Sequence, residues 1–518
     1  MSSTFFGLEI ARKALTAQQS GLYTTGHNIA NANTPGYTRQ RVNFEQEMPY
    51  PSPARNRPQI PGQFGTGVSM DSVQRVRDGF LDVQYRHESN KLGYWGTRAD
   101  ALEKMEEIMN EPSESGLAIT LDRFWQSLQD LALNPTNAGA RAVVRERGVA
   151  VAETFNYLSN SLTDIQQDIK SEVELNIKEV NSLLNQINNV NKQIGEIEPH
   201  GYLPNDLYDE RDRLLDQLSS LVNIRVTPVL SGGNAKEIAE GKVKVELIDD
   251  QGRSLGTIVD GEKLKVNELT VKYDGTNGLV NEIAIGTKDI NITDFTSSGK
   301  LLGNIHSYGY TYTTASGTVV KEGLFPEMLH KLDSLAYDFA KEFNNVHQLG
   351  YSIEDINSGS HTPEDFFAYS GSTPPTDSDK TGAAAQLKVS DIILSNYDHI
   401  AASKTGNMGD GSNASDLADV KNKTFTIDGT FTTVQNYYES LIGGMAVDAQ
   451  EANRLSGNSE TLKDAVDKRR QSISSVSLDE EMTNMIQFQH AYNAAARLIT
   501  LQDEMLDRII NNMGLVGR

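Results

Sequence analysis

Hydrophobic residues near both ends of the chain follow the alternating spacing of three and four that is typical of coiled-coil helices. In residues 477–518, where Gln489 and Asp503 are polar members of the series, the apolar members are Leu478, Met482, Met485, Tyr492, Ala496, Ile499, Leu506, Ile510 and Met513. Ser477 and Glu480 have the spacing of a capping box, so we expect the helix to begin there. A stripe of this length needs a partner, which could be a bundle core within the same chain or another helix.

A second series runs from residue 4 to about residue 32, and its apolar members are Leu8, Ala11, Leu15, Leu22, Ile29 and Ala32. Gly7, Gly21 and Gly26 each cost a helix about 1 kcal/mol relative to alanine, so we expect this helix to be marginal without a partner. Residues 1–60 are net basic and residues 478–518 are net acidic. Opposite charge permits the two ends to associate with each other.

Between the two ends the pattern changes twice. Residues 92–131 and 155–197 have helical spacing, the second with one four-residue step between Ile169 and Val173, and Pro199 ends it. An unbroken helix of some sixty residues would extend about 90 Å. Residues 223–320 alternate with a period of two and contain turn pairs such as Asp274-Gly275, which predicts strands.

Helical spacing returns at residues 326–347 and again at 434–476, on either side of a Gly/Ser/Asp-rich region, and residues 48–61 read as an extended, proline-rich connector. We therefore predict an α+β multidomain fold with long coiled-coil-like helical termini, a helical rod domain and inserted antiparallel β domains. The predicted domains are residues 1–50 plus 477–518 (terminal), 51–222 plus 433–476 (helical rod), 223–325 (β), and 326–432 (a connecting helix and a second small region).

Composition narrows the possible partners and compartments. The chain has 518 residues and a formal net charge of −23, which makes nucleic acid an unfavourable partner. It contains no cysteine, so disulfides and thiol chemistry are excluded. No apolar stretch has the length of a signal-peptide core or a membrane span, which predicts a cytoplasmic protein unless export uses a different address.

Candidate chemistry is sparse. The nine histidines show no HxxH or HExxH spacing. The glycine-rich residues 231–236 lack the pattern of a phosphate loop, and residues 406–413 lack the acidic ligands of an EF-hand, so we interpret both as turns or loops. We predict no catalytic residue, no metal site and no cofactor, and the sequence gives no reason to expect an enzyme.

Two terminal motifs carry a family resemblance. Residues 27–40 read HNIANANTPGYTRQ, and residues 477–482 and 486–492 read SLDEEM and IQFQHAY. Both resemble the terminal motifs of bacterial flagellar axial proteins, and the overall length resembles the hook-associated members of that family. From this resemblance we expect an assembly motif comprising Asn28, Ile29, Asn31, Asn33, Thr34, Pro35, Gly36, Tyr37, Arg39 and Gln40.

The resemblance implies a structural axial component at the junction between hook and filament, exported by the flagellar type III apparatus without a cleaved signal and located outside the cell. It implies a ring or tubular homo-oligomer whose partners are the hook protein, a second hook-associated junction protein, and a cytoplasmic export chaperone at the C-terminal helix. The expected assembly seam is Leu8, Leu15, Leu22, Ile29, Leu478, Met482, Met485, Tyr492, Ile499, Leu506 and Ile510.

Two other interpretations are consistent with the same residues. The chain could be the hook protein itself, which would polymerise alone into long curved tubes. It could instead be a secreted adhesin or enzyme displayed on flagellar axial termini, with its site in residues 223–432. A deep pocket with converging titratable groups in that region would favour the second interpretation.

Overall fold

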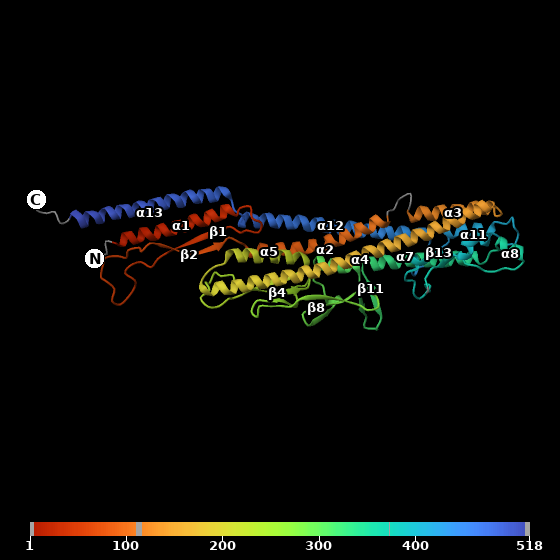
Figure 1. Ribbon diagram of the computed structural model, residues 1–518, viewed down its shortest axis with the longest axis horizontal. Coiled ribbons are helices and arrows are strands. Elements are labelled where there is room, and N and C mark those ends of the chain that lie inside the picture. The colour runs from red at the N-terminus through yellow and green to blue at the C-terminus, as the bar shows by residue number, and fades with distance from the viewer. Residues whose placement is uncertain (1–4, 110–115, 372, 513–518) are drawn as a thin grey trace.

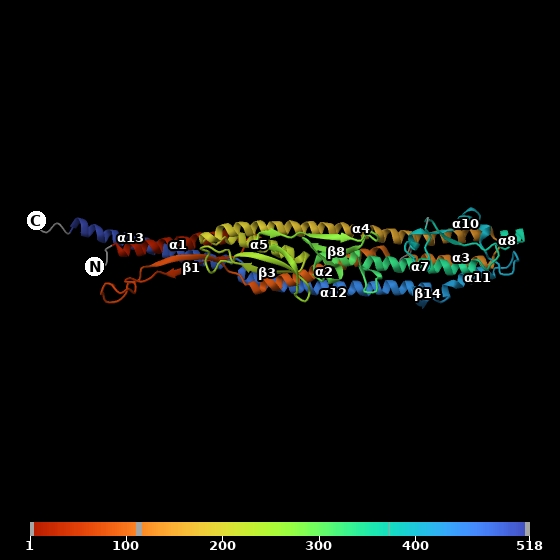
Figure 2. The ribbon, with the colours of Figure 1, turned by 90° about the horizontal axis from the view of Figure 1, so that it is seen from below.

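The computed structural model describes residues 5–109, 116–371 and 373–512 and shows an elongated molecule in which the first and last described residues lie at the same end (Figure 1). Helices run along its length and carry two small sheets on one side (Figures 1 and 2). This arrangement confirms the predicted α+β fold with long helical termini and inserted antiparallel strands. Within the described ranges, no helix combines the length and hydrophobicity needed to cross a membrane.

The longest helix, α4 (Ala138–Ile197), is unbroken over 60 residues and so extends about 90 Å. It begins where the Asn137 side chain accepts hydrogen bonds from the backbone N–H groups of Gly139 (2.8 Å) and Ala140 (3.3 Å). A 3₁₀ turn containing Pro199 ends it. Its buried residues include both Ile169 and Val173, so the predicted four-residue step keeps the apolar stripe on one face.

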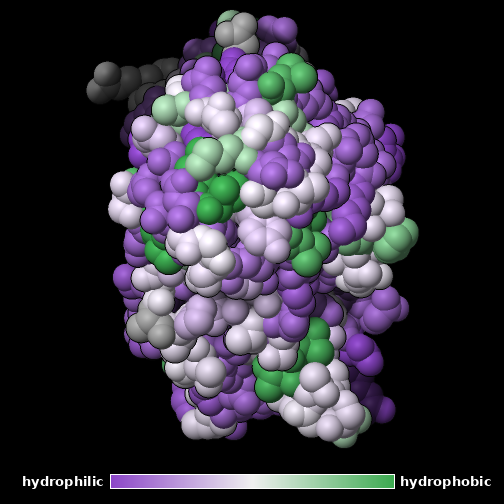
Figure 3. Space-filling model, turned by 90° about the vertical axis from the view of Figure 1, so that its right-hand side faces the viewer, coloured by the Kyte–Doolittle hydropathy of each residue, from purple (hydrophilic) through white to green (hydrophobic). Residues whose placement is uncertain are grey.

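Five further helices complete a helical body with α4 (Figures 1 and 2): α2 (Gly79–Met109), α3 (Leu117–Leu133), α5 (Asn205–Leu221), α7 (Leu324–His347) and α12 (Val434–Ser474). Far from the chain termini, an aromatic cluster fills the body with the rings of Phe124, Trp125, Phe155, Phe339, Phe343, Phe366 and Phe367. The outer surface of this end is mostly hydrophilic, with hydrophobic residues in small separated areas (Figure 3).

Two sheets pack along α4 in the region predicted to be β. The first has the order β3 (Ile224–Val229), β4 (Lys242–Ile248), β5 (Ser254–Asp260), β6 (Lys265–Val266). The second has the order β11 (Val319–Glu322), β10 (Tyr310–Thr313), β8 (Val280–Ile285), β7 (Leu269–Tyr273), with β9 (Lys288–Asn291) also paired to β8. All strand pairs are antiparallel except a single parallel bridge between β10 and β8.

The β region also contains a helix that the sequence analysis missed, α6 (Lys300–Tyr308). It lies between α2 and α4, and a Cβ added at Gly303 would lie 2.9 Å from the Tyr94 carbonyl oxygen of α2. Its apolar spacing covers only nine residues and includes this glycine, so local propensity alone does not predict it.

Residues 350–432 wrap the far end of the body and contribute to the same core. Their short elements are α8 (Ile353–Ser358), β12 (Phe367–Tyr369), α9 (Ala383–Gln386), β13 (Leu387–Val389), α10 (Asp391–Ser395), α11 (Ser412–Asp419), β14 (Phe425–Ile427) and β15 (Thr430–Thr432). Buried Phe366 and Phe367 join the aromatic cluster, so this region shares a core with α3, α4 and α7.

An antiparallel hairpin, β1 (Gln40–Gln46) with β2 (Val68–Arg75), follows the N-terminal helix and was not predicted. The proline-rich residues 48–61 lie in the loop of this hairpin, and Tyr50 and Phe64 bridge its two sides. The expectation of an extended connector was therefore wrong, because β2 brings the chain back alongside β1. Mostly polar residues in β1 and β2 hide the alternation that identifies a half-buried strand.

Candidate assembly site at the paired termini

The two terminal helices, α1 (Phe6–Ala30) and α13 (Leu478–Asn512), pack against each other in antiparallel orientation and extend beyond the helical body (Figure 1). Three contacts define their register: Gly7 faces Gln502, Gly21 faces Phe488, and Asn28 bonds to Glu481. The steps between these positions are equal and opposite on the two helices. The chain's own beginning is therefore the partner of its C-terminal helix.

Glycine allows the two helices to approach closely. A Cβ added at Gly7 would lie 2.8 Å from the Gln502 side chain, and one at Gly21 would lie 3.1 Å from the Phe488 ring. These glycines weaken α1 as an isolated helix, as expected from the sequence. In the structure, the absence of side chains at Gly7 and Gly21 leaves room for Gln502 and Phe488 of α13.

The predicted seam residues occupy two different environments. Leu8, Leu15, Leu22 and Ile29 of α1 are partly buried, and so are Met485, Tyr492, Ile499 and Leu506 of α13. By contrast, Leu478, Met482 and Ile510 are 50%, 57% and 73% exposed. Met513 lies outside the described residues.

For Met482 the physical reason is a rotation, because at about 100° per residue Met482 lies about 100° around the helix from Glu481, which faces α1. The line of α13 that faces α1 includes Glu481, Phe488, Ala495 and Gln502. Two of these four residues are polar, so a search for hydrophobic positions favours the neighbouring line. Leu478 and Ile510 are exposed for another reason, since the register places Leu478 past Ala30, where α1 ends, and Ile510 beyond Phe6, where α1 begins.

At the base of the helix pair, the side chains of Asn28, Tyr37, Arg39 and Glu481 and the backbone of Gln40 form a hydrogen-bonded cluster that we call the terminal knot. Asn28 Oδ1 accepts from the Gln40 backbone N–H (3.0 Å) and the Tyr37 hydroxyl (2.7 Å). Asn28 Nδ2 donates to the Gln40 carbonyl (2.8 Å) and to Glu481 Oε2 (3.1 Å). The buried amide thereby holds the two terminal motifs together.

Arg39 connects the terminal knot to both C-terminal helices, α12 and α13. Its Nε donates to Glu481 Oε1 (2.8 Å), another guanidinium nitrogen pairs with Glu480 (2.6 Å), and its backbone N–H donates to the Ser474 carbonyl at the end of α12 (2.9 Å). The predicted capping box is therefore only half formed. Ser477 Oγ accepts from the Glu480 N–H at 3.5 Å, while the Glu480 carboxylate bonds Arg39.

The remaining motif residues form the turn that leads from α1 into the knot. Tyr37 N–H donates to the Thr34 carbonyl (3.2 Å) and Gly36 has φ +83°, the geometry expected of a type II turn centred on Pro35 and Gly36. Asn31 Nδ2 donates to the His27 carbonyl (3.1 Å) and its Oδ1 accepts from the Thr34 hydroxyl (3.2 Å). Asn33, Thr34, Pro35 and Gly36 are exposed, whereas Ile29 is partly buried.

The knot is anchored to the helical body through α5. Thr38 N–H donates to Asp209 Oδ2 (3.0 Å), and Gln40 Nε2 donates to Asp206 Oδ1 (3.2 Å). From there a charged network continues through Arg75, which pairs with Asp209 (2.7 Å), Asp212 (3.0 Å) and Glu240 (2.5 Å). The sequence analysis missed this network because its members come from β2, α2, α5 and α12.

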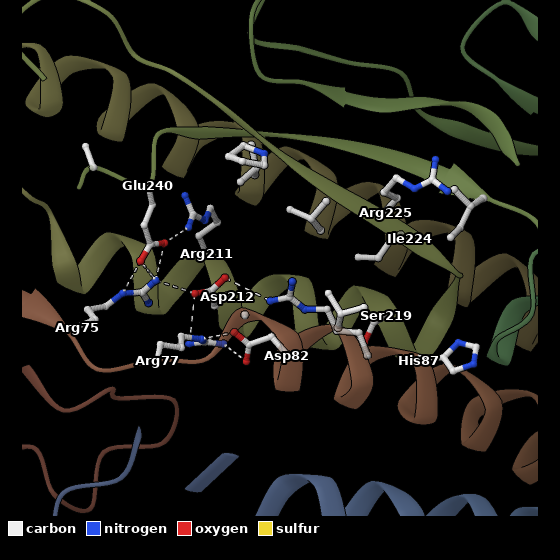
Figure 4. A pocket seen from close by; sticks show the side chains of 18 of the residues that line it. Arg75, Arg77, Asp82, His87, Arg211, Asp212, Ser219, Ile224, Arg225 and Glu240 are labelled. Carbon is white, nitrogen blue, oxygen red and sulfur yellow. Dashed lines mark hydrogen bonds and ion pairs between the residues drawn. The ribbon is translucent and has the colours of Figure 1, made fainter. Parts of the chain in front are cut away.

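The charged network lines a cleft of about 740 Å³ between α2, α5 and β3 (Figure 4). Asp212 is buried, which by itself would raise its pKa, but Arg77, Arg211, Arg75 and Arg86 together hold the pKa well below its usual range. The carboxylates in the cleft are thus paired with arginines, including Asp82 with Arg77 (2.6 Å). Among the described residues, no three His, Cys, Asp or Glu side chains are grouped so as to hold a metal ion.

Comparison with known proteins matches all three parts of this arrangement. Residues 102–367 match the family model of the flagellar hook-associated protein FlgK helical domain. Residues 470–513 match the flagellar basal body rod FlgEFG protein C-terminal model, and residues 8–38 match the flagella basal body rod protein model. A flagellar hook-associated protein 1 from Bacillus subtilis is 51% identical over 100% of both chains.

This chain belongs to the flagellar hook-associated protein 1 family. The Escherichia coli member is 24% identical and covers 97% of this chain and 98% of its own. The flagellar hook junction protein FlgK from Burkholderia pseudomallei is 14% identical with a TM-score of 0.57, covers 77% of this chain and 100% of its own, and so shares its fold. Membership confirms the resemblance seen in the two terminal motifs, and places the chain in a family of structural flagellar proteins.

Proposed function

We propose that this chain is a structural component of the bacterial flagellum that forms the junction between hook and filament and assembles through the α1–α13 pair. One observation carries the proposal: the two terminal family motifs meet in the terminal knot, from which α1 and α13 extend beyond the body with apolar side chains still exposed. A helix pair that leaves apolar surface in water gains free energy when neighbouring subunits cover that surface.

Three parts of the molecule fit a radial arrangement of such subunits. The terminal helices would form the inner tube of a homo-oligomer, the helical body the next shell, and the sheets on one side of the body the outer face. Hook protein would bind on one side of this layer and a second hook-associated junction protein on the other.

Until the chain has been exported and assembled, no neighbouring subunit covers the apolar surface of the terminal helices. We propose that the chain leaves the cell through the flagellar type III apparatus without a cleaved signal, and that a cytoplasmic chaperone covers α13 until then. The half-exposed leucine, isoleucine and methionine side chains of α13 are the surface such a chaperone would bind. The paired charges of the α2–α5–β3 cleft support a structural role for that region rather than an enzymatic one.

Substitution of residues between the helices tests the assembly role. In a strain lacking the natural protein, Ile499→Asp and Tyr492→Asp should abolish attached filaments, leaving bare hooks and filament protein in the medium. The purified variants should retain the helical circular dichroism of the body. Leu175→Asp, at an exposed position on α4, is the matched control and should leave filaments attached. Normal filaments in both α13 variants would contradict assembly through this pair.

A further inference from the structure

The outer surface of α13 carries two separate apolar flanks. The proximal flank, near the terminal knot, consists of Leu478, Met482 and Ile486. The distal flank, toward the C-terminus, consists of Leu498, Leu501, Met505 and Ile509. All seven side chains are between 43% and 57% exposed, although α1 packs against the same helix.

The two flanks lie on different sides of the helix. At about 100° per residue, their centres are about 140° apart. The proximal flank is turned away from the line of Glu481, Phe488 and Ala495 that faces α1, whereas the distal flank borders that line, and its last member, Ile509, continues the line past the start of α1. A polar ridge formed by His490, Arg497, Glu504 and Arg508 separates them. Each copy therefore offers a neighbour two different apolar surfaces.

We propose that the distal flank of one copy packs on the proximal flank of a second copy, with the two α13 helices parallel and displaced by about 19 residues, or about 28 Å. The inference rests on the proposed assembly through the terminal helices and specifies its geometry. Copies related by rotation about a common axis point the same way along it, and a contact between two different surfaces repeats from copy to copy. Because of the displacement, this contact builds a helical layer rather than a flat ring.

Side-chain spacing selects the register. A displacement of 19 residues places Leu501 opposite Met482 and Met505 opposite Ile486, and both pairs repeat with the same four-residue step. Leu498 then lies near Leu478, so the apolar residues of the proximal flank are all covered.

Charge at the edge of the contact favours a second copy as the occupant. In the proposed register Arg497 of one helix comes close to Asp479 of the next, both at the border of the polar ridge. Within the described part of the chain neither side chain forms an ion pair, so both are available to a neighbour. The contact thus joins two apolar surfaces and opposite charges at one register.

A double-mutant cycle in the full chain, made in a strain lacking the natural protein, tests the register. Met482→Glu and Leu501→Lys should each reduce the number of attached filaments by about tenfold, because each places a charge against an apolar flank. The double variant should recover to within about threefold of the natural chain, because every contact then contains one glutamate and one lysine. Circular dichroism of each purified chain checks that the helices form.

The outcomes separate the two levels of the hypothesis. If both single variants assemble like the natural chain, assembly through α13, and with it the proposed function, is contradicted. If both singles are impaired and the double variant is no better than the worse single, the proposed function stands and the register is overturned.

Cross-linking gives an independent readout because the natural chain contains no cysteine. Positions 482 and 501 are about 28 Å apart on one rigid helix, so a disulfide in Met482→Cys/Leu501→Cys flagella must join two copies. We expect a ladder of multimers under oxidation and none from either single variant. Dimers from Leu501→Cys alone would show that the distal flanks of two copies pack against each other, which contradicts the register. Assembled flagella of the double variant without cross-links would also contradict the register.

Discussion

The helical body and the terminal helix pair satisfy their hydrophobic residues in different ways. In the body, Phe124, Phe155, Phe339 and Phe343 are completely buried within a single chain. In α13, of the side chains that the structure describes, Glu481 and Ala495 are the buried ones, while the larger apolar residues remain partly or half exposed. The body is thus complete in one copy, whereas the terminal pair is completed by its neighbours.

This difference indicates that the helical body determines the stability of the isolated chain and that the outside of α13 determines its assembly. Substitutions in the aromatic cluster should lower the free energy of unfolding of the isolated chain. Substitutions on the outside of α13 should leave that quantity unchanged and reduce assembly. The terminal knot lies between the two regions, and we expect it to affect both.

The largest expected effect is in the aromatic cluster. Phe343→Ala should lower the free energy of unfolding of the body by about 3–5 kcal/mol, because it leaves a cavity among five other aromatic rings. Denaturant titration followed by circular dichroism measures the loss. Leu501→Ala, at a half-exposed position of α13, is the contrasting variant and should change it by less than about 0.5 kcal/mol. Equal effects of the two substitutions would show that the body and the outside of α13 contribute alike to the stability of the isolated chain.

Acid should destabilise the body through a buried histidine. His347 Nδ1 donates to the Glu364 carbonyl (2.7 Å) and its Nε2 accepts from the Ala401 N–H (3.0 Å), so the neutral ring is the native form. Burial lowers the pKa of His347 to about 4. Its stabilising contribution is complete above the unfolded pKa of about 6.5 and is lost as pH falls toward 4, a total of about 3 kcal/mol.

The measurement is the free energy of unfolding between pH 7 and pH 4 for the natural chain and for His347→Gln. The variant should lose less stability on acidification than the natural chain. Some acid loss should remain, because burial also lowers the pKa of His306 to about 4. Identical pH profiles for the two chains would show that His347 is not held neutral.

A moderate effect is expected in the terminal knot. Asn28→Ala removes the amide that bonds Gln40 and Glu481, leaving a buried carboxylate with fewer partners, and should weaken the attachment of α13 by about 1–3 kcal/mol. Hydrogen exchange in the first turns of α13 should become faster, while exchange in α4 stays the same. Asn33→Ala, at an exposed position of the same motif, should change neither rate.

The smallest expected effect distinguishes two glycines of α1. Gly26 has open space where a Cβ would lie, so Gly26→Ala should stabilise α1 by about 1 kcal/mol. Gly21→Ala should give less, because its Cβ would lie 3.1 Å from the Phe488 ring. Helix protection by hydrogen exchange compares the two variants. An equal gain at both positions would show that close approach does not limit the α1–α13 contact.

Long periodic helices could be predicted from the sequence, and features built from distant residues could not. The apolar stripe of α4 is continuous from Phe155, so the helix and its end at Pro199 were predicted, whereas its first turns from Ala138 were not. α6 and the β1–β2 hairpin were missed because nine residues with a central glycine, and two polar strands, depend on tertiary contacts for their stability.

The candidate site shows the same division. The motif around Asn28 and the C-terminal motif that contains Glu481 were both recognised, yet the hydrogen bond between Asn28 and Glu481 was not predicted, because a buried carboxylate on a helix surface has no periodic signal. The predicted seam of α13 lies to one side of the line that faces α1 for the same reason. Arg75 and Asp212 come together only when β2 and α5 pack near each other, so no local sequence pattern predicts the charged network.

Hydrogen exchange on the isolated chain and on assembled flagella tests most directly the claim that the terminal helices are completed by neighbours. We predict that amides of α13 exchange at least about tenfold more slowly after assembly, whereas amides of α4 exchange at the same rate in both states. Equal and strong protection of α13 before and after assembly would contradict the account.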